Sequence, residues 1–153
     1  EIDRVAAGAT FSDKKFTKPR LKDGTLDFSF SGLKTALLRR AEEKGWYPPF
    51  EGVQIDPTVL ASVAAAYQEA IVGSMVDKTV EAVKKCKVKG VLLGGGVAAN
   101  TLLRKQMIER SPVEVVMPSS DLCTDNGAMI GAAGWFHIGD GAQSQWDLID
   151  LIF

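Results

Sequence analysis

The residues of this sequence best suited to binding chemistry are three consecutive glycines, Gly94–Gly96, which follow the apolar run Val91-Leu92-Leu93. Because glycine has no side chain, the backbone of this turn lets a ligand approach closely. A helical pattern follows, and the unpaired N–H groups at a helix start suit an anion or a polar ligand. No Gly-Lys-Ser/Thr follows and no G-x-G-x-x-G can be drawn through the turn, so it matches neither common phosphate motif. The glycines could also serve only the close packing of a helix on a sheet.

Two polar side chains lie where they could hold such a ligand. Asn100 is expected in the first turn of the following helix, where its amide could bind a sugar hydroxyl or an acyl oxygen, or could satisfy local backbone groups. Asp125, in the segment Cys123-Thr124-Asp125-Asn126-Gly127, directly precedes another expected helix. Its carboxylate could be an ordinary N-cap, and the same position could bind a metal or hold a ligand hydroxyl.

Other catalytic arrangements are not visible in the sequence. The single histidine, His137, has no histidine or cysteine at a metal-binding spacing, so we expect no histidine-based metal site from this chain alone. Ser31 lacks a G-x-S-x-G context, and no base is visible that would activate Cys123. Cys86 and Cys123 fit neither a disulfide framework nor a zinc spacing, which predicts a reduced, cytoplasmic protein.

A basic cluster with one aromatic ring occupies residues 14–20, within the polar N-terminal segment 1–25. Basic side chains beside an aromatic ring can grip phosphate and stack a base, so this cluster is a candidate contact for tRNA or for a protein partner. A solvated loop before a strand is the alternative interpretation. The candidate contact residues are Lys14, Lys15, Lys18 and Arg20.

The elements that must position these residues alternate between strand and helix. A period-two pattern would place Leu26, Phe28 and Phe30 on one buried face of a strand. Asp56 as N-cap and Pro57 at the first helical position predict the start of a long helix. The predicted strands cover 26–31, 89–93 and 113–117, and the predicted helices cover 33–43, 57–85, 98–110 and 126–138, the last one small and apolar enough for close packing.

This alternation indicates an α/β domain with at least partly parallel strands. Ligands of such sheets lie beyond the carboxyl ends of the strands, where both candidate turns, after Leu93 and after Met117, are found. The 153 residues, 46% of them hydrophobic, suffice for a single domain over 1–153 with an irregular tail at 139–153. No uninterrupted apolar run approaches the roughly 20 residues that span a bilayer, so we expect no membrane contact. A chain that starts at Glu1 rather than at Met is expected to be a piece of something longer.

Three segments resemble the signature segments of the family that makes threonylcarbamoyladenosine on tRNA, formerly labelled O-sialoglycoprotein endopeptidases or glycoproteases. They are Leu26–Thr35, Gly94–Asn100 and Leu122–Ile130, and Ile2-Asp3 resembles the residues after that family's Pro-Gly-Gly-Pro turn. Their order and spacing match along nearly the whole chain, from residue 1 to about residue 138. The resemblance implies a ribonuclease-H-like half of the actin/sugar-kinase/heat-shock ATPase fold, a mixed sheet flanked by helices. The chain would be most of the second, C-terminal half of a two-domain parent.

The resemblance also implies an activity and its residues. The family's transferase passes the threonylcarbamoyl group of threonylcarbamoyl-adenylate to the N6 amine of adenosine 37 in tRNA. Asp125 matches the aspartate that binds the metal, Asn100 an asparagine that contacts the adenylate, and Asp3 a substrate-contacting aspartate. The glycines Gly94, Gly95 and Gly96 would accept the nucleotide. The intact parent would hold one divalent metal, iron or zinc, and its partners would be tRNA, a paralogous protein of the same fold and a small ATPase.

The sequence departs from the family at the residues that hold its metal and its acyl group, and it lacks the family's Arg-Trp-Pro-like ending. The H-x-x-x-H pair that holds the family's metal and the glycine-rich segment that holds the acyl group are both absent, so we expect the fragment alone to be inactive. One alternative is a metalloendopeptidase, as the older label says, which would need a metal-bound water and a general base that the chain does not show. The other is a non-catalytic nucleotide-binding or assembly module, which would have no need of Asp125.

Overall fold

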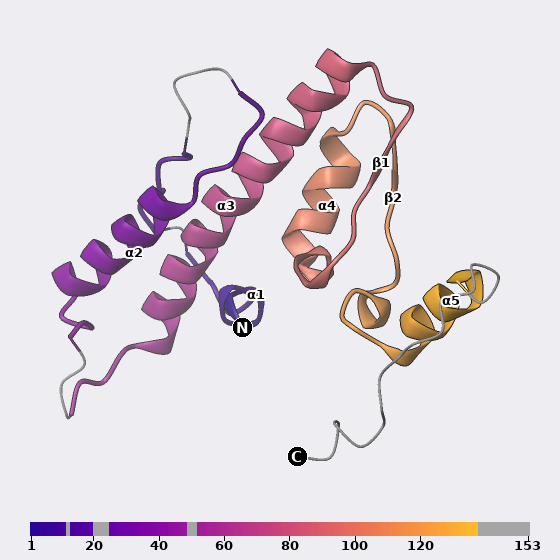
Figure 1. The fold of residues 1–153 in the computed structure, drawn as a ribbon. Helices are drawn as coiled ribbons and strands as arrows, with labels where there is room; N and C mark the ends of the chain where they lie inside the picture. The colour runs from indigo at the N-terminus through magenta and orange to yellow at the C-terminus, as the bar shows by residue number, and fades with distance from the viewer. Residues whose placement is uncertain (12, 20–24, 49–51, 138–153) are drawn as a thin grey trace.

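A long central helix, α3 (Pro57–Cys86), organises the structure, with α2 on one side and α4, β1 and β2 on the other (Figure 1). The structure is a computed structural model that describes residues 1–11, 13–19, 25–48 and 52–137. The other elements, in chain order, are α1 (Ile2–Ala6), α2 (Ser31–Glu43), β1 (Gly90–Leu92), the 3₁₀ helix η1 (Gly96–Ala99), α4 (Thr101–Arg110), β2 (Glu114–Val116), the 3₁₀ helix η2 (Ser120–Leu122) and α5 (Gly127–His137).

The long helix begins where the sequence predicts. The Asp56 carboxylate accepts a hydrogen bond from the Thr58 N–H at 2.8 Å, and Pro57 occupies the first helical position, where its missing N–H costs nothing. The helix ends at Cys86, and the left-handed backbone of the C-cap residue Lys87 (φ 52°) terminates it. By length and composition α3 could cross a membrane, but more than half of its most apolar stretch is buried inside the structure. Its apolar surface therefore serves as the core of the described fold.

Two hydrophobic clusters lie on opposite sides of α3. The first joins α3 to α2 and to the segment before it, and in it the Phe16 ring meets the Tyr67 ring edge-on at 5.4 Å between centroids. The second joins α3 to α4 and to the inner face of the sheet. The first cluster consists of Phe16, Leu33, Val63, Tyr67 and Ala70, and the second of Val72, Val76, Leu103 and Met107.

The sheet in the described part of the chain is a parallel pair. β1 and β2 run side by side in the register Val91↔Val115, and the Leu93 N–H donates to the Val116 carbonyl at 2.9 Å. The connection between them passes through α4, which makes a β-α-β unit. The expected parallel strands and their crossover helix are confirmed, although the described chain as a whole is mostly helical.

Two expectations about the elements are wrong. Residues 26–30 form no strand: they pair with no described strand, Phe28 is exposed, and its ring stacks on that of Phe30 at 5.9 Å. A period-two pattern makes a strand only where a neighbouring strand supplies backbone partners. α5 does not pack closely either, since Ile130, Trp135 and Phe136 are 72%, 75% and 78% exposed. The predicted tail, 139–153, lies outside the described residues, as does Arg20.

Candidate functional site

The strongest candidate for a binding site is a cavity of about 480 Å³ between α1 and η1, beyond the carboxyl end of β1. Its lining includes Asp3, Gly96 and Asn100, which the sequence separates widely and the fold brings together. This is the position at which parallel α/β sheets bind ligands. The cavity is lined by Glu1, Ile2, Asp3, Gly96, Val97, Ala99 and Asn100.

The glycine turn is open rather than tightly packed. A Cβ placed on Gly94 or Gly96 would meet no described atom within 4 Å, so close packing of a helix on the sheet does not explain these two glycines. Gly95 has a positive φ of 84°, a conformation that side chains disfavour, and the backbone turns there into η1. The turn therefore exposes backbone at the edge of the cavity.

Asn100 satisfies backbone groups at the start of a helix, one of the two roles that the sequence left open. Its Oδ1 accepts a hydrogen bond from the Leu103 N–H at 2.9 Å, which makes Asn100 the N-cap of α4 rather than a residue of its first turn. Within the described residues its Nδ2 donates to no other group. One end of the amide is thus fixed by the helix, and the other end remains available to a ligand in the cavity.

Asp3 is held by three hydrogen bonds from two other helices. Its Oδ1 accepts from Gln68 Nε2 at 2.9 Å, and its Oδ2 accepts from the Thr101 N–H at 3.0 Å and from the Thr101 hydroxyl at 2.9 Å. Partial burial acts to raise the pKa of Asp3, but the bonds from Thr101 and Gln68 outweigh it and hold that pKa below its ordinary value. Asp3 is therefore anionic at neutral pH and ties α1 to α3 and to the start of α4.

Asp125 is not the N-cap of α5. That role falls to Asn126, whose Oδ1 accepts from the Met129 N–H at 3.0 Å. Asp125 itself is exposed and does not line the cavity. Within the described residues, no group of three or more histidine, cysteine, aspartate or glutamate side chains could hold a metal ion. The single carboxylate of Asp125 therefore does not fit a metal by itself, and His137 stands at the far end of α5.

The two candidate turns nevertheless lie together, joined by a residue that the sequence did not single out. The Arg104 guanidinium donates to the Ala98 carbonyl of η1 at 3.0 Å and to the Pro118 carbonyl, just before η2, at 2.8 Å. Its Nη1 also lies 3.7 Å from the sulfur of Cys123. Burial is the common state of a free cysteine; Cys123 is buried, but Cys86 is exposed. Nothing in the sequence around Arg104 indicates that its side chain will reach the carbonyls of both turns.

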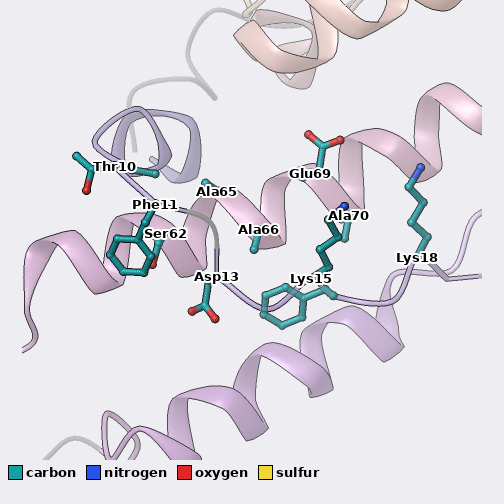
Figure 2. Close-up of a pocket in the computed structure, with 12 residues that line it drawn as sticks. Thr10, Phe11, Asp13, Lys15, Lys18, Ser62, Ala65, Ala66, Glu69 and Ala70 are labelled. Carbon is teal, nitrogen blue, oxygen red and sulfur yellow. The ribbon is translucent and has the colours of Figure 1, made fainter.

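Part of the basic cluster lines a second cavity, of about 620 Å³, between residues 9–11 and 13–18 on one side and α3 on the other (Figure 2). Lys15 lines this cavity, Lys14 is exposed, and Lys18 reaches Asp77 of α3 with its Nζ 2.8 Å from Oδ2. A Cβ at Gly73 would lie 2.5 Å from Lys18 Cε, so the glycine makes room for this side chain. Lys18 therefore already serves the fold.

The aromatic ring of the basic cluster does not serve nucleic-acid binding. Phe16 is buried in the first hydrophobic cluster, and the Arg40 guanidinium carbon lies 3.9 Å from its ring centroid. The idea that this ring could stack a base is therefore wrong. Asp13 turns toward α2, where Arg40 and Lys44 lie 3.8 Å and 3.9 Å from its carboxylate (Figure 2). Lys14 and Lys15 remain the described members of the cluster without a structural ion pair.

Residues 1–132 match the sequence family described as "TsaD: tRNA N6-adenosine threonylcarbamoyltransferase". The protein of that name from Syntrophotalea carbinolica is 42% identical over 151 residues, an alignment that covers 96% of this chain and 42% of the relative. The one from Clostridium botulinum is 36% identical over 151 residues, with 97% and 42% covered. The one from Dehalococcoides mccartyi is 43% identical over 125 residues, with 82% and 35% covered. The chain thus spans about two fifths of the length of these relatives.

Proposed function

This chain belongs to the family of the tRNA N6-adenosine threonylcarbamoyltransferases, and from that premise we propose that it is part of such an enzyme. The parent would transfer the threonylcarbamoyl group of threonylcarbamoyl-adenylate to the N6 amine of adenosine 37 in tRNA. We further propose that the chain is most of the second half of a two-domain parent with the actin/sugar-kinase/heat-shock ATPase fold. The order of its motifs supports this assignment, and so does its share of about two fifths of the relatives' length.

The observation that carries the proposal is the cavity shared by Asp3, Gly96 and Asn100. Its volume of about 480 Å³ lies within the range of sites that hold small ligands. We assign the nucleotide part of the adenylate to this cavity. The amide Nδ2 of Asn100 would donate to an oxygen of the ligand, and the exposed backbone of Gly94–Gly96 would let the nucleotide approach closely.

Asp125 keeps its proposed role as one ligand of the family's divalent metal, iron or zinc. The bridge that Arg104 makes between η1 and η2 supports a position of Asp125 on the same side of the fold as the glycine turn. The described residues supply no complete metal site, so the remaining ligands would have to come from outside this part of the chain.

The proposed contacts with tRNA and with protein partners are inferred from family membership and from the positive charge of the N-terminal segment. Lys14 and Lys15 are the described candidates for tRNA binding, whereas Lys18 is paired with Asp77. A paralogous partner of the same fold and a small ATPase are proposed from the resemblance. The cytoplasmic location is proposed from the cysteine pattern, and the lack of membrane contact is proposed from the apolar runs of the sequence.

The direct test gives the full-length protein threonylcarbamoyl-adenylate and a tRNA transcript, and measures modified adenosine by mass spectrometry of the digested RNA. The transfer should occur with the wild-type protein and fall sharply with Asp125→Ala. Cleavage of a peptide substrate without RNA modification would support the metalloendopeptidase instead. Binding of AMP with neither activity would support a non-catalytic module, and either result would overturn the transferase.

A further inference from the structure

Gln68 is a polar side chain in the middle of the longest helix, and it is only 6% exposed. Buried amides normally have hydrogen-bond partners, because an unpaired polar group away from water is costly. Within the described part of the chain, this amide makes one hydrogen bond, and that bond goes to Asp3. A carboxylate can only accept, so the end of the amide that faces Asp3 is its NH₂ group. The buried position of Gln68 therefore serves Asp3.

The bond from Gln68 completes a connection between three helices at the edge of the cavity. Gln68 in α3 holds one carboxylate oxygen of Asp3 in α1, and Thr101 at the start of α4 holds the other. Bonds to both oxygens fix the rotation of the carboxylate plane as well as its position. Thr101 directly follows the N-cap Asn100, so the orientation of Asp3 is coupled to the helix start that carries the second proposed ligand contact.

We propose that Gln68 is a positioning residue: its buried amide sets the orientation of the Asp3 carboxylate at the cavity, and through Asp3 it holds α1 against the start of α4. This inference rests on the proposed function, because it assumes that Asp3 and Asn100 contact the adenylate. Gln68 is not a catalytic residue, since it does not line the 480 Å³ cavity itself.

Other charged groups near Asp3 must be kept constant in any test. Glu69 of α3 and Lys105 of α4 line the groove that Asp3 also lines. Glu1, which precedes α1, pairs with Arg4 of α1. The bonds from Thr101 and Gln68 hold the pKa of Asp3 below its ordinary value against the effect of burial. Removal of the Gln68 N–H leaves these charges in place, so any change in the titration of Asp3 reports on the lost bond.

The experiment compares Gln68→Met with a matched control in the full-length protein. Methionine keeps the length and much of the volume of the side chain but has no N–H donor. The control is Gln106→Met, because Gln106 of α4 makes a similar interhelical bond, from Nε2 to Glu69 Oε1 at 2.9 Å, that does not involve Asp3. Carbon-13 NMR of labelled aspartate carboxyls follows the Asp3 titration, and calorimetry measures binding of AMP.

We expect Gln68→Met to raise the pKa of Asp3 and to weaken AMP binding by about three- to tenfold, the effect of one lost hydrogen bond. Gln106→Met should change neither quantity. If Gln68→Met does not fold, Gln68→Leu is a second uncharged side chain without a donor, so it should raise the pKa of Asp3 as well. An unchanged Asp3 titration in the folded variant overturns the inference.

The two measurements also separate this inference from the proposed function. If the wild-type protein does not bind AMP but the titration of Asp3 moves, Gln68 positions Asp3 and the nucleotide assignment is wrong. If AMP binds to the wild-type protein and to Gln68→Met equally well, Gln68 does not position a substrate contact, and the inference fails while the proposed cavity stands.

Discussion

Asn100 offers the sharpest test of the proposed cavity, because the two ends of its amide have separable roles. The Oδ1 atom caps α4 through the Leu103 N–H at 2.9 Å, and the Nδ2 atom is free within the described residues to donate to a ligand. Asn100→Ala removes both functions. Asn100→Ser keeps a side-chain oxygen that is about as good an N-cap as asparagine, but it removes the amide donor.

The structure gives a magnitude for each role. Loss of an N-cap costs typically about 1 kcal/mol of unfolding free energy, so Asn100→Ala should be destabilised by that amount and Asn100→Ser by less than about 0.5 kcal/mol. Loss of one hydrogen bond to the ligand is worth about 0.5–1.5 kcal/mol, which weakens AMP binding roughly three- to tenfold in both variants. The serine variant therefore separates stability from binding.

The assay is urea unfolding for stability and isothermal calorimetry with AMP for affinity, both on the full-length protein. Asn126→Ala is the matched control, because Asn126 caps α5 through the Met129 N–H and does not line the cavity. It should lose stability without any loss of AMP affinity. If Asn100→Ser binds AMP as well as the wild type does, Asn100 is a helix cap only and the proposed ligand contact is refuted.

Three further predictions concern charge, packing and RNA. Partial burial raises the pKa of Asp77, but hydrogen bonds and ion pairs from basic side chains outweigh it, so the folded pKa lies below the ordinary value of about 3.9. The stability that Asp77 contributes is present above that pH and lost as the pH falls through the folded pKa. Asp77→Asn should remove this pH-dependent part of the unfolding free energy, at most about 1 kcal/mol because the ion pairs with Lys18 and Arg110 are well exposed. Urea unfolding at neutral and acid pH measures it. Leu103→Ala should lower the unfolding free energy by about 2–5 kcal/mol in thermal or urea unfolding, because Leu103 is 0% exposed. Ile130→Ala, at a site 72% exposed, should change it by less than about 0.5 kcal/mol. Equal losses of stability in the two variants would contradict the packing described. Replacement of Lys14 and Lys15 by alanine should weaken tRNA binding and make it less salt-dependent. The slope of log affinity against log salt concentration should fall by about 0.7–0.9 per lost phosphate contact. An unchanged slope in filter binding would show that these residues do not contact tRNA.

Much of the fold follows from signals between neighbours in the chain. Asp56 and Pro57 mark the start of α3, and the apolar runs that end at Leu93 and Met117 become the parallel strands β1 and β2. Asn100 falls at the start of a helix as predicted, within one residue. These features depend on hydrogen bonds and periodicities that span only a few residues, so the local sequence is enough to specify them.

The local sequence does not settle which of two neighbouring residues caps a helix, or whether a strand forms without a visible partner. Asp125 and Asn126 are equally good N-caps, and a shift of one residue in the start of α5 decides between them. The pattern of 26–31 is a strand only if another strand pairs with it, and the described chain provides none. In both cases the sequence narrows the choice, and the surrounding structure makes it.

The arrangement of the candidate site was decided only in three dimensions. Nothing near Asp3 in the sequence indicates that its carboxylate will meet Thr101 and Gln68, and nothing near Arg104 indicates that it will join the two turns. The sequence suggested that Phe16 could stack a base, but its ring is buried where α2 packs on α3. Contacts between residues so far apart in the chain exist only after the helices have packed and the entropy of closing the intervening chain has been offset. The sequence by itself therefore determined the elements and the residue types at their ends, and the tertiary structure determined which of those residues share a cavity.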